Sequence, residues 1–427
     1  MRRLVVLGAG TAGTMVVNKL RSKLPRAEWS ITIVDPATKH YYQPGFLFLP
    51  FGTYQPKDVV RPLRPTLNLT KGIELISAAV DKVDGAGRLV HLDNGAKLGY
   101  DYLIIATGTS PRPEETPGMS DGLGANVHEF FTYEGSMALA ATLADFQGGR
   151  VVVHVTEMPI KCPVAPLEFA FLTDAYFRRR GIRDKVELSY VTPLPGAFTK
   201  PVSAKYLGDM LEQRRIALEP DFVVESIDAE AGTLTSFDER EIGFDLLVTI
   251  PVNMGADYVG RSGLGDELNY VPVDKHTLLS TADDHIFAIG DATDAAASKA
   301  GSVAHFEADA FVPNFLAHVE GKPMPESFDG HANCFIESGD GKALLIDFNY
   351  DTEPLPGSYP LPVVGPMRLL KETRINHWGK LAFRWIYWNI LLPGRRMPVP
   401  AHMSMTGKRR PPTTETTTDA VRIPPGM

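Results

Sequence analysis

The chain has 427 residues, 44% of them hydrophobic and 22% charged, and its formal net charge is −8 at pH 7. This composition excludes a wholly disordered protein, and the length allows two or three domains. Two cysteines are too few for a disulfide-dense scaffold and fit no zinc-knuckle spacing, so we expect no metal site, and we expect no nucleic-acid partner.

The N-terminal residues predict a strand, a glycine-rich turn and a helix, followed by a second strand over residues 30–34. The apolar start favours a first strand over a cleaved signal peptide. Gly8, Gly10 and Gly13 follow the G-x-G-x-x-G pattern, and Asp35 ends the second strand. Gly8 allows the tight turn, Gly10 lets a pyrophosphate approach the backbone, and Gly13 lets the helix pack close to the strand. Because the Asp35 carboxylate can accept hydrogen bonds from ribose hydroxyls, this stretch predicts a dinucleotide-binding unit.

Two later strands end in turns that extend this pattern. The stretch YDYLIIATG ends at Thr107 and Gly108, and HIFAIGD ends at Gly290 and Asp291. Together with the N-terminal glycines, these turns resemble those of the two-dinucleotide-binding-domain flavoproteins over residues 1–310. The resemblance implies that the first unit binds FAD rather than NAD, with Gly290 and Asp291 against the flavin ribityl chain.

The middle of the chain predicts a second strand-turn-helix unit, with a strand over residues 151–154 and a helix over residues 168–180. The connection VTEMPIKCPVAP has three prolines and no glycine, and it contains Cys162. A stiff turn without glycine does not let a pyrophosphate reach the backbone amides. We therefore expect no nicotinamide nucleotide here, and the same turn could hold a thiol against the flavin.

Three short motifs resemble those of the sulfide:quinone oxidoreductase family over nearly the whole chain. They are KCPVAPLE, which holds Cys162 and Glu168, NCF, which holds Cys334, and HWGKLAFRWIYW. The resemblance implies that the two cysteines lie at one face of the flavin and form a disulfide or a sulfur bridge. Hydrosulfide would attack that bridge and leave a persulfide on one cysteine, while two electrons pass through the flavin to a quinone. Glu168 matches the acid–base glutamate of the family.

The residue types are compatible with this chemistry, and each also has a structural alternative. A thiolate is the reactive form of cysteine, and Lys161 beside Cys162 would favour it electrostatically. For Cys162 and Cys334 the alternative is a pair of buried structural thiols. For Glu168 the alternative is a first-turn acid favoured by the helix dipole.

The third motif and its neighbours imply a quinone site. Lys380 matches a family lysine near the N1 edge of the flavin, where its charge would stabilise the reduced ring, and it also borders the quinone. Phe335 and Phe383 match aromatic residues that sandwich the quinone head, and plain core packing is the alternative for both.

Two departures from the family pattern bear on the sulfur chemistry. Residues 117–135 lack the third cysteine of most bacterial members, which places polysulfide growth in doubt and favours a small thiol or sulfane-sulfur acceptor. Residues 192–199 lack an expected histidine, so a second acid–base group would come from elsewhere, with His128 and His305 as candidates.

The C-terminal region predicts an amphipathic helix that holds Trp378, Trp385 and Trp388 within a wide apolar surface. Residues 367–410 carry ten lysines or arginines and one acid. An aromatic and basic helix too short to span a bilayer is suited to the headgroup zone of a membrane. The alternatives are a dimer interface and a cap on the flavin domain.

The sequence as a whole predicts an α/β fold with two interleaved Rossmann-like dinucleotide-binding domains and a C-terminal amphipathic membrane-binding region. The expected segments are an FAD-binding domain (residues 1–117 and 275–360), a second Rossmann-like domain without a nicotinamide glycine motif (118–274), the membrane-binding region (361–403) and a disordered tail (404–427).

The expected function is membrane-associated oxidation of hydrogen sulfide to a persulfide or sulfane-sulfur product, with electrons passing through the cysteine pair and FAD to quinone. The expected location is peripheral, or monotopic, on the cytoplasmic membrane, with the side and any homo-oligomer left open. The alternatives are the flavin subunit of a flavocytochrome c-type sulfide dehydrogenase and a non-catalytic membrane flavoprotein scaffold.

Overall fold

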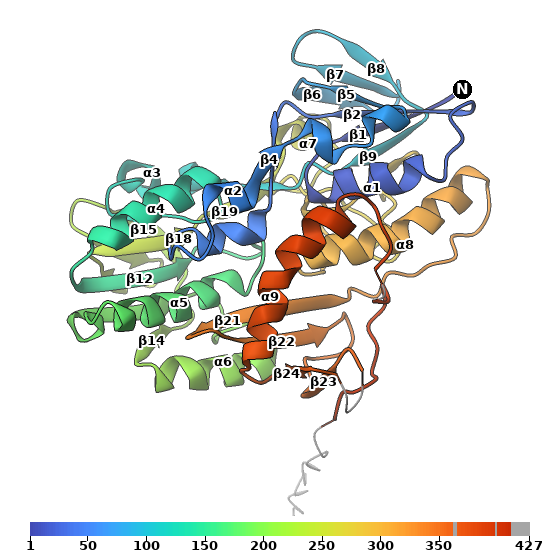
Figure 1. The fold of residues 1–427 in the computed structure, drawn as a ribbon. Helices are drawn as coiled ribbons and strands as arrows, with labels where there is room; N and C mark the ends of the chain where they lie inside the picture. The colour runs from blue at the N-terminus through green and yellow to red at the C-terminus, as the bar shows by residue number, and fades with distance from the viewer. Residues whose placement is uncertain (362–364, 398, 411–427) are drawn as a thin grey trace, which may run out of the picture.

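The structure is a computed structural model that describes residues 1–361, 365–397 and 399–410 (Figure 1). Its two largest sheets have five strands each, and every strand pair in them is parallel. Parallel sheets need crossover helices and bury both faces, which explains the nearly continuous apolar runs of their strands. The predicted mixed α/β class with Rossmann-like sheets is confirmed.

The first parallel sheet combines four strands from residues 2–105 with one from residues 286–288, in the order β20-β9-β1-β2-β5. The helices α1 (Thr11–Arg21) and α8 (Gly301–Val319) pack against each other beside it (Figure 1). Its strands are β1 (Arg2–Leu7), β2 (Trp29–Val34), β5 (Ile73–Ile76), β9 (Tyr102–Ile105) and β20 (Ile286–Ala288). Because β20 pairs with β9, the turns that follow both strands end at the same edge of the sheet.

The second parallel sheet has the order β11-β18-β12-β13-β14 and is built from the middle of the chain. Its strands are β11 (Val127–His128), β12 (Gly149–Val155), β13 (Val186–Val191), β14 (Ile216–Glu219) and β18 (Leu246–Ile250). The helices of this segment are α4 (Tyr133–Asp145), α5 (Ala165–Arg179) and α6 (Pro201–Gln213). The helix α5 begins three residues before the predicted start at residue 168. The exact domain boundaries stay a prediction.

Smaller antiparallel elements decorate the two units. They are β3 (Lys39–Tyr41) with β4 (Val60–Pro62), β6 (Val80–Asp84) with β7 (Leu89–Leu92) and β8 (Lys97–Gly99), β10 (Thr109–Arg112) with β19 (Val252–Gly255), and β15 (Val224–Asp228) with β16 (Thr233–Ser236) and β17 (Glu241–Gly243). Short helices are α2 (Pro56–Val59), α3 (Met119–Gly122) and α7 (Asp257–Arg261).

A four-stranded sheet near the C-terminus carries the second cysteine. Its order is β21-β22-β24-β23, from β21 (Ala332–Gly339), β22 (Lys342–Phe348), β23 (Gly357–Tyr359) and β24 (Met367–Leu369). The strand β21 packs against α5, and α9 (Arg374–Ile386) crosses β21 and β22 (Figure 1). This arrangement brings α5, β21 and α9, which are distant in sequence, into contact.

The exposed apolar surface of the C-terminal helix is smaller than the sequence predicted. The helix α9 is followed by a π-helical turn (Tyr387–Leu391) whose tyrosine is buried. Trp378 and Trp385 are 64% and 62% exposed, whereas Trp388 is 6% exposed, and its indole N–H donates to the Asp58 carbonyl. Placing Trp388 on the exposed apolar surface was therefore wrong, because the π-helical turn directs this ring into the core.

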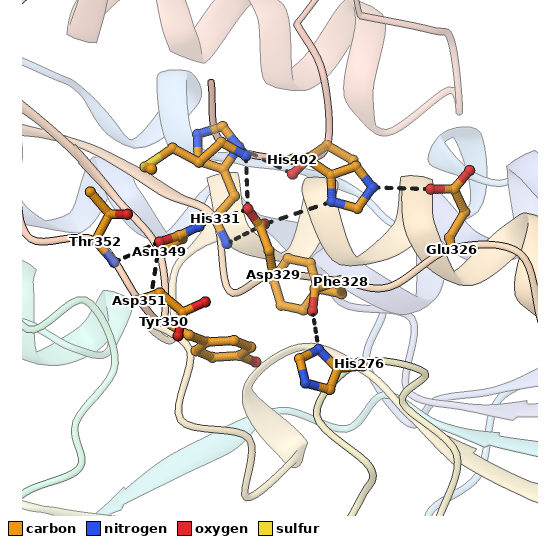
Figure 2. A network of polar contacts seen from close by, with 12 residues as sticks. His276, Glu326, Phe328, Asp329, His331, Asn349, Tyr350, Asp351, Thr352 and His402 are labelled. Carbon is orange, nitrogen blue, oxygen red and sulfur yellow. Dashed lines mark hydrogen bonds and ion pairs between the residues drawn. The ribbon is translucent and has the colours of Figure 1, made fainter. Parts of the chain in front are cut away.

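Residues 404–410, which we expected to begin a disordered tail, are ordered against the four-stranded sheet that contains β22 and β23. The Lys408 ammonium and the Asp347 carboxylate form an ion pair in which each side chain is 1% exposed. His331 also contacts Asp347, at 2.8 Å. Just before, His402 lies between Glu326 and Asp329, as Figure 2 shows. A polar composition predicted disorder here, and specific buried partners overcome it. Residues 411–427 of the predicted tail lie outside the described residues.

Replacing Lys408 by methionine is expected to lower the free energy of unfolding by about 3 kcal/mol, because the buried Asp347 carboxylate then loses its cationic partner. Chemical denaturation of the two proteins measures the difference. The matched control is Lys205→Met, which removes an exposed pair with Asp209 (side chains 80% and 53% exposed) and should change stability by less than about 1 kcal/mol. Equal effects of the two substitutions would contradict this account of the C-terminal segment.

Candidate functional site

A cavity of about 1430 Å3, its open mouth included, is bordered by several elements that are distant in sequence. These are the turn after β1, the end of β9, the turn before α5, the segment between β20 and α8, the strand β21, and α9. Of the predicted site residues, the cavity lining includes Gly10, Thr107, Gly108, Cys162, Glu168, Gly290, Asp291, Cys334, Phe335, Lys380 and Phe383. Gly8, Gly13 and Asp35 do not line the cavity.

The first glycine turn has the close contacts that the pattern predicts. A Cβ atom on Gly13 would lie 1.9 Å from the Gly8 carbonyl oxygen, and Gly8 has a φ of +95°. A Cβ atom on Gly10 would meet nothing within 4 Å, so the open side of this turn faces the cavity. Asp35 accepts the Ala9 N–H at 2.6 Å and thereby orders the turn. These features fit a dinucleotide diphosphate at the N-terminus of α1.

In the turn before α5, a cysteine adopts a backbone conformation that usually requires glycine. Cys162 has a φ of +46°, in the left-handed region that non-glycine residues rarely occupy. Its N–H donates to the Lys299 carbonyl at 2.6 Å, and its own carbonyl accepts the Ala165 N–H at 2.8 Å. Such outliers persist where surrounding contacts hold them, and they cluster at functional sites. The turn thus presents the Cys162 thiol to the cavity.

The two cysteines are free thiols that line the same cavity from the turn before α5 and from β21. Burial raises the pKa of both thiols, that of Cys334 to about 12, and the charge of Lys380 opposes the rise. The expectation that Lys161 provides this positive charge is not supported. Its ammonium lies 3.4 Å from both the Gln43 side chain and the Thr109 carbonyl. Lys380, far away in sequence, is the cation that acts on both sulfurs.

Glu168 and Lys380 form a buried ion pair at the cavity. The Lys380 ammonium also donates to the Phe335 carbonyl at 3.0 Å, and the Glu168 Oε1 accepts the Glu337 N–H at 2.7 Å. Burial raises the pKa of Glu168 to about 7, against the opposing effect of Lys380. Its second oxygen, Oε2, has no hydrogen-bond partner among the described residues. A fully buried carboxyl with a free oxygen at a cavity is suited to proton transfer, unlike a solvated first-turn acid.

The aromatic residues expected at the quinone site border the cavity from β21 and α9. Phe335 packs so closely on α9 that a Cβ atom on Gly379 would lie 2.9 Å from its ring. The ring centroid of Phe383 lies 6.4 Å from that of Tyr42, which also lines the cavity. The end of the cavity near α9 is therefore apolar, with the Lys380 ammonium beside it.

Two residues that we had not predicted lie next to the ion pair. The His377 Nδ1 lies 2.9 Å from both carboxylate oxygens of Glu337. The sequence carried a signal for each, because strand alternation places Phe335 and Glu337 on one face, and helical spacing places His377 three residues before Lys380. The histidine candidates His128 and His305 are absent from the cavity lining.

Comparisons with known proteins agree with this geometry. The family described as pyridine nucleotide-disulphide oxidoreductase matches residues 2–308. The mitochondrial sulfide:quinone oxidoreductase of Dictyostelium discoideum is 26% identical over 404 residues, 92% of this chain and 86% of that protein. The mitochondrial protein of the same name from Mus musculus is 25% identical over 92% of this chain and 86% of its own.

The fold is shared as well. The structure of the sulfide:quinone oxidoreductase from Aquifex aeolicus superposes with a TM-score of 0.78 at 21% sequence identity, covering 92% of each chain. The match confirms the resemblance drawn from the three motifs, and the glycine turns together with the family imply FAD as the cofactor. The chain belongs to the pyridine nucleotide-disulphide oxidoreductase family and is similar along most of its length to sulfide:quinone oxidoreductases.

Proposed function

We propose that the protein oxidises hydrogen sulfide and transfers the electrons to a quinone, with Cys162 and Cys334 as the sulfur-handling pair. One observation carries the proposal: a cavity whose lining includes both cysteines, the Glu168–Lys380 pair and the cofactor turns. The relatives that share most of the chain are named for the same reaction.

On the sulfur side, the working state has Cys162 and Cys334 joined by a sulfur bridge. Hydrosulfide attacks one sulfur of that bridge, so that one S–S bond forms, another breaks, and the freed cysteine becomes a thiolate. The charge of Lys380 stabilises this thiolate, and Glu168 accepts the hydrosulfide proton. Bound FAD supplies the acceptor for the electron pair. A small thiol or another sulfane-sulfur acceptor then removes the extra sulfur.

On the quinone side, the chain offers an apolar end of the cavity with one cation. Phe335 and Phe383 hold the ring by stacking, and Lys380 donates a hydrogen bond to a quinone oxygen as negative charge develops there. The Lys380–Glu168 pair borders both the cysteines and the apolar end of the cavity. It therefore couples proton release from hydrosulfide to proton uptake by the quinone.

Anaerobic titration of the FAD-loaded protein tests the proposal. Sulfide should bleach the flavin absorbance, and a soluble quinone analogue should restore it. Bleaching that only a haem protein reverses would favour the flavocytochrome subunit instead. No bleaching by sulfide would favour a non-catalytic scaffold and end the proposal.

We further propose that α9 attaches the protein to one face of a membrane. Its exposed side carries Ile375, Trp378 and Trp385, and the exposed Arg395 and Arg396 follow the helix. Indole rings near cations suit the headgroup zone of anionic lipids. In residues 1–361, 365–397 and 399–410, no helix is long and apolar enough to cross a membrane. Attachment by α9 would bring the quinone end of the cavity close to the lipid phase.

Replacing Trp378 and Trp385 together by alanine is expected to weaken binding to anionic lipid vesicles at least about tenfold, because each exposed indole loses its burial in lipid. Vesicle sedimentation measures the change. Phe237→Ala is the matched control, since Phe237 is 69% exposed on the middle domain and should not affect binding. Equal vesicle binding by the tryptophan variant and the parent would contradict attachment through α9.

A further inference from the structure

We propose that Glu337 and His377 form a proton path that supplies the Lys380–Glu168 pair from the surface of α9. The inference rests on the proposed function, because the quinone is the group that consumes the protons. It assigns a task to two residues that the sulfur chemistry does not use.

The balance of the reaction requires such a supply. Hydrosulfide loses two electrons and one proton when its sulfur becomes sulfane sulfur, whereas a quinone gains two electrons and two protons when it becomes a quinol. One proton per turnover must therefore come from water. The Glu168 and Lys380 side chains are only 1% and 12% exposed, so acid–base groups that reach the surface would help to supply this proton.

The geometry provides that connection through β21 and α9. The His377 side chain is 18% exposed, and its Nδ1 contacts both oxygens of Glu337, whose side chain is 1% exposed. On the strand, the Glu337 N–H donates to Glu168, and the Phe335 carbonyl accepts from Lys380. Phe335 and Glu337 thus bind the ion pair through their backbone groups, and the Glu337 side chain extends from the same strand to His377.

The charged and titratable groups around the path come from three directions. Lys380 lies on α9 three residues after His377, Glu168 comes from α5, and Tyr54 comes from the loop before α2. The charge of Glu337 acts on all three of these groups. Glu337 contacts His377 through its carboxylate and Glu168 through its backbone N–H, so this one residue connects the surface of α9 with the Lys380–Glu168 pair.

A purely structural role for the histidine is the competing explanation, since an imidazole could simply tie α9 to β21. His377→Asn separates the two roles, because asparagine keeps a donor near the Nδ1 position but cannot titrate. His402→Asn is the matched control. His402 makes a similar contact with Glu326 at 3.0 Å (Figure 2), but it lies in the C-terminal segment and does not line the cavity.

The kinetic test bypasses sulfide. The FAD-loaded protein is reduced by light without oxygen, and its reoxidation by a soluble quinone is followed by stopped flow at several pH values. We expect His377→Asn and His377→Ala to slow reoxidation at least about tenfold at high pH, with added imidazole restoring the alanine variant. His402→Asn should behave as the parent. Unchanged rates in both His377 variants, or slowing that imidazole does not relieve, would overturn the inference.

A second readout does not depend on turnover. Nitrogen NMR of the resting protein follows the ring nitrogens of His377, and Glu337→Gln should change the Nδ1 resonance, because Nδ1 contacts both carboxylate oxygens of Glu337. An unchanged His377 Nδ1 resonance would overturn the coupling between the two residues. Failure of sulfide to bleach the flavin would end the proposed sulfide oxidation, whereas the reoxidation of light-reduced protein by quinone would still test this inference. A light-reduced parent that no quinone reoxidises would overturn both the quinone half and this inference.

Discussion

Replacing Cys162 by serine is expected to lower sulfide-dependent quinone reduction at least about 1000-fold, and Cys334→Ser should do the same. A serine hydroxyl can form neither the sulfur bridge that hydrosulfide attacks nor the persulfide that follows. Because the two cysteines act as one unit, the double variant should be no slower than either single variant. Steady-state reduction of a soluble quinone by sulfide measures the three rates.

The same variants should leave the protein intact, which separates chemistry from folding. Serine has nearly the size of cysteine and can keep the backbone contacts of residue 162 with Lys299 and Ala165. FAD content and thermal stability should therefore match the parent. Light-reduced Cys162→Ser should also be reoxidised by quinone at the parental rate, because the quinone side of the cavity does not use the thiol. Parental turnover with sulfide in both cysteine variants would show that the mechanism is wrong.

Glu168→Gln is expected to slow flavin reduction by sulfide about 100-fold near neutral pH, because the amide cannot accept a proton. The pKa of Glu168 is raised to about 7 by burial, so the parent should gain rate as pH rises through that value and Glu168 loses its proton. This inflection should disappear in Glu168→Gln. Stopped-flow absorbance at a series of pH values measures both profiles.

Glu168→Asp is the control for that experiment, since it keeps the carboxylate and should retain part of the rate and the rise with pH. Hydrogen sulfide itself titrates near neutral pH, so the comparison is between variants and not with an absolute profile. In the parent and in Glu168→Asp, Lys380 should stay positively charged, because burial lowers its pKa but the neighbouring carboxylates raise it by more. If the Glu168→Gln profile ran parallel to the parent at an unchanged rate, another group would be the base.

Local sequence rules predicted much of the cofactor-binding frame. The contacts of Gly13 with Gly8, and the open side at Gly10, follow from a spacing that only one backbone geometry satisfies. The glycine-free turn was informative for the same reason, because a left-handed position that glycine would normally fill holds Cys162 instead. Such features depend on a few neighbouring residues, so the sequence shows them directly.

The charge around the thiols could not be predicted in the same way. Chain neighbourhood pointed to Lys161, whereas the packing of α9 across β21 brings Lys380 to both sulfurs. The burial of the Trp388 ring and the ion pair between Lys408 and Asp347 were not predicted for a similar reason. Each depends on a partner that lies far away in sequence, and composition or helical periodicity carries no information about such partners.

The most direct test of the account is whether Cys162 and Cys334 become joined through sulfur in the working protein. FAD-loaded protein is cycled with sulfide and quinone, its free thiols are alkylated, and its peptides are analysed by mass spectrometry without reduction. We predict a cross-linked species in which the Cys162 and Cys334 peptides are held together directly or through added sulfur. Recovery of both cysteines as separate alkylated thiols from protein that turns over would contradict the mechanism.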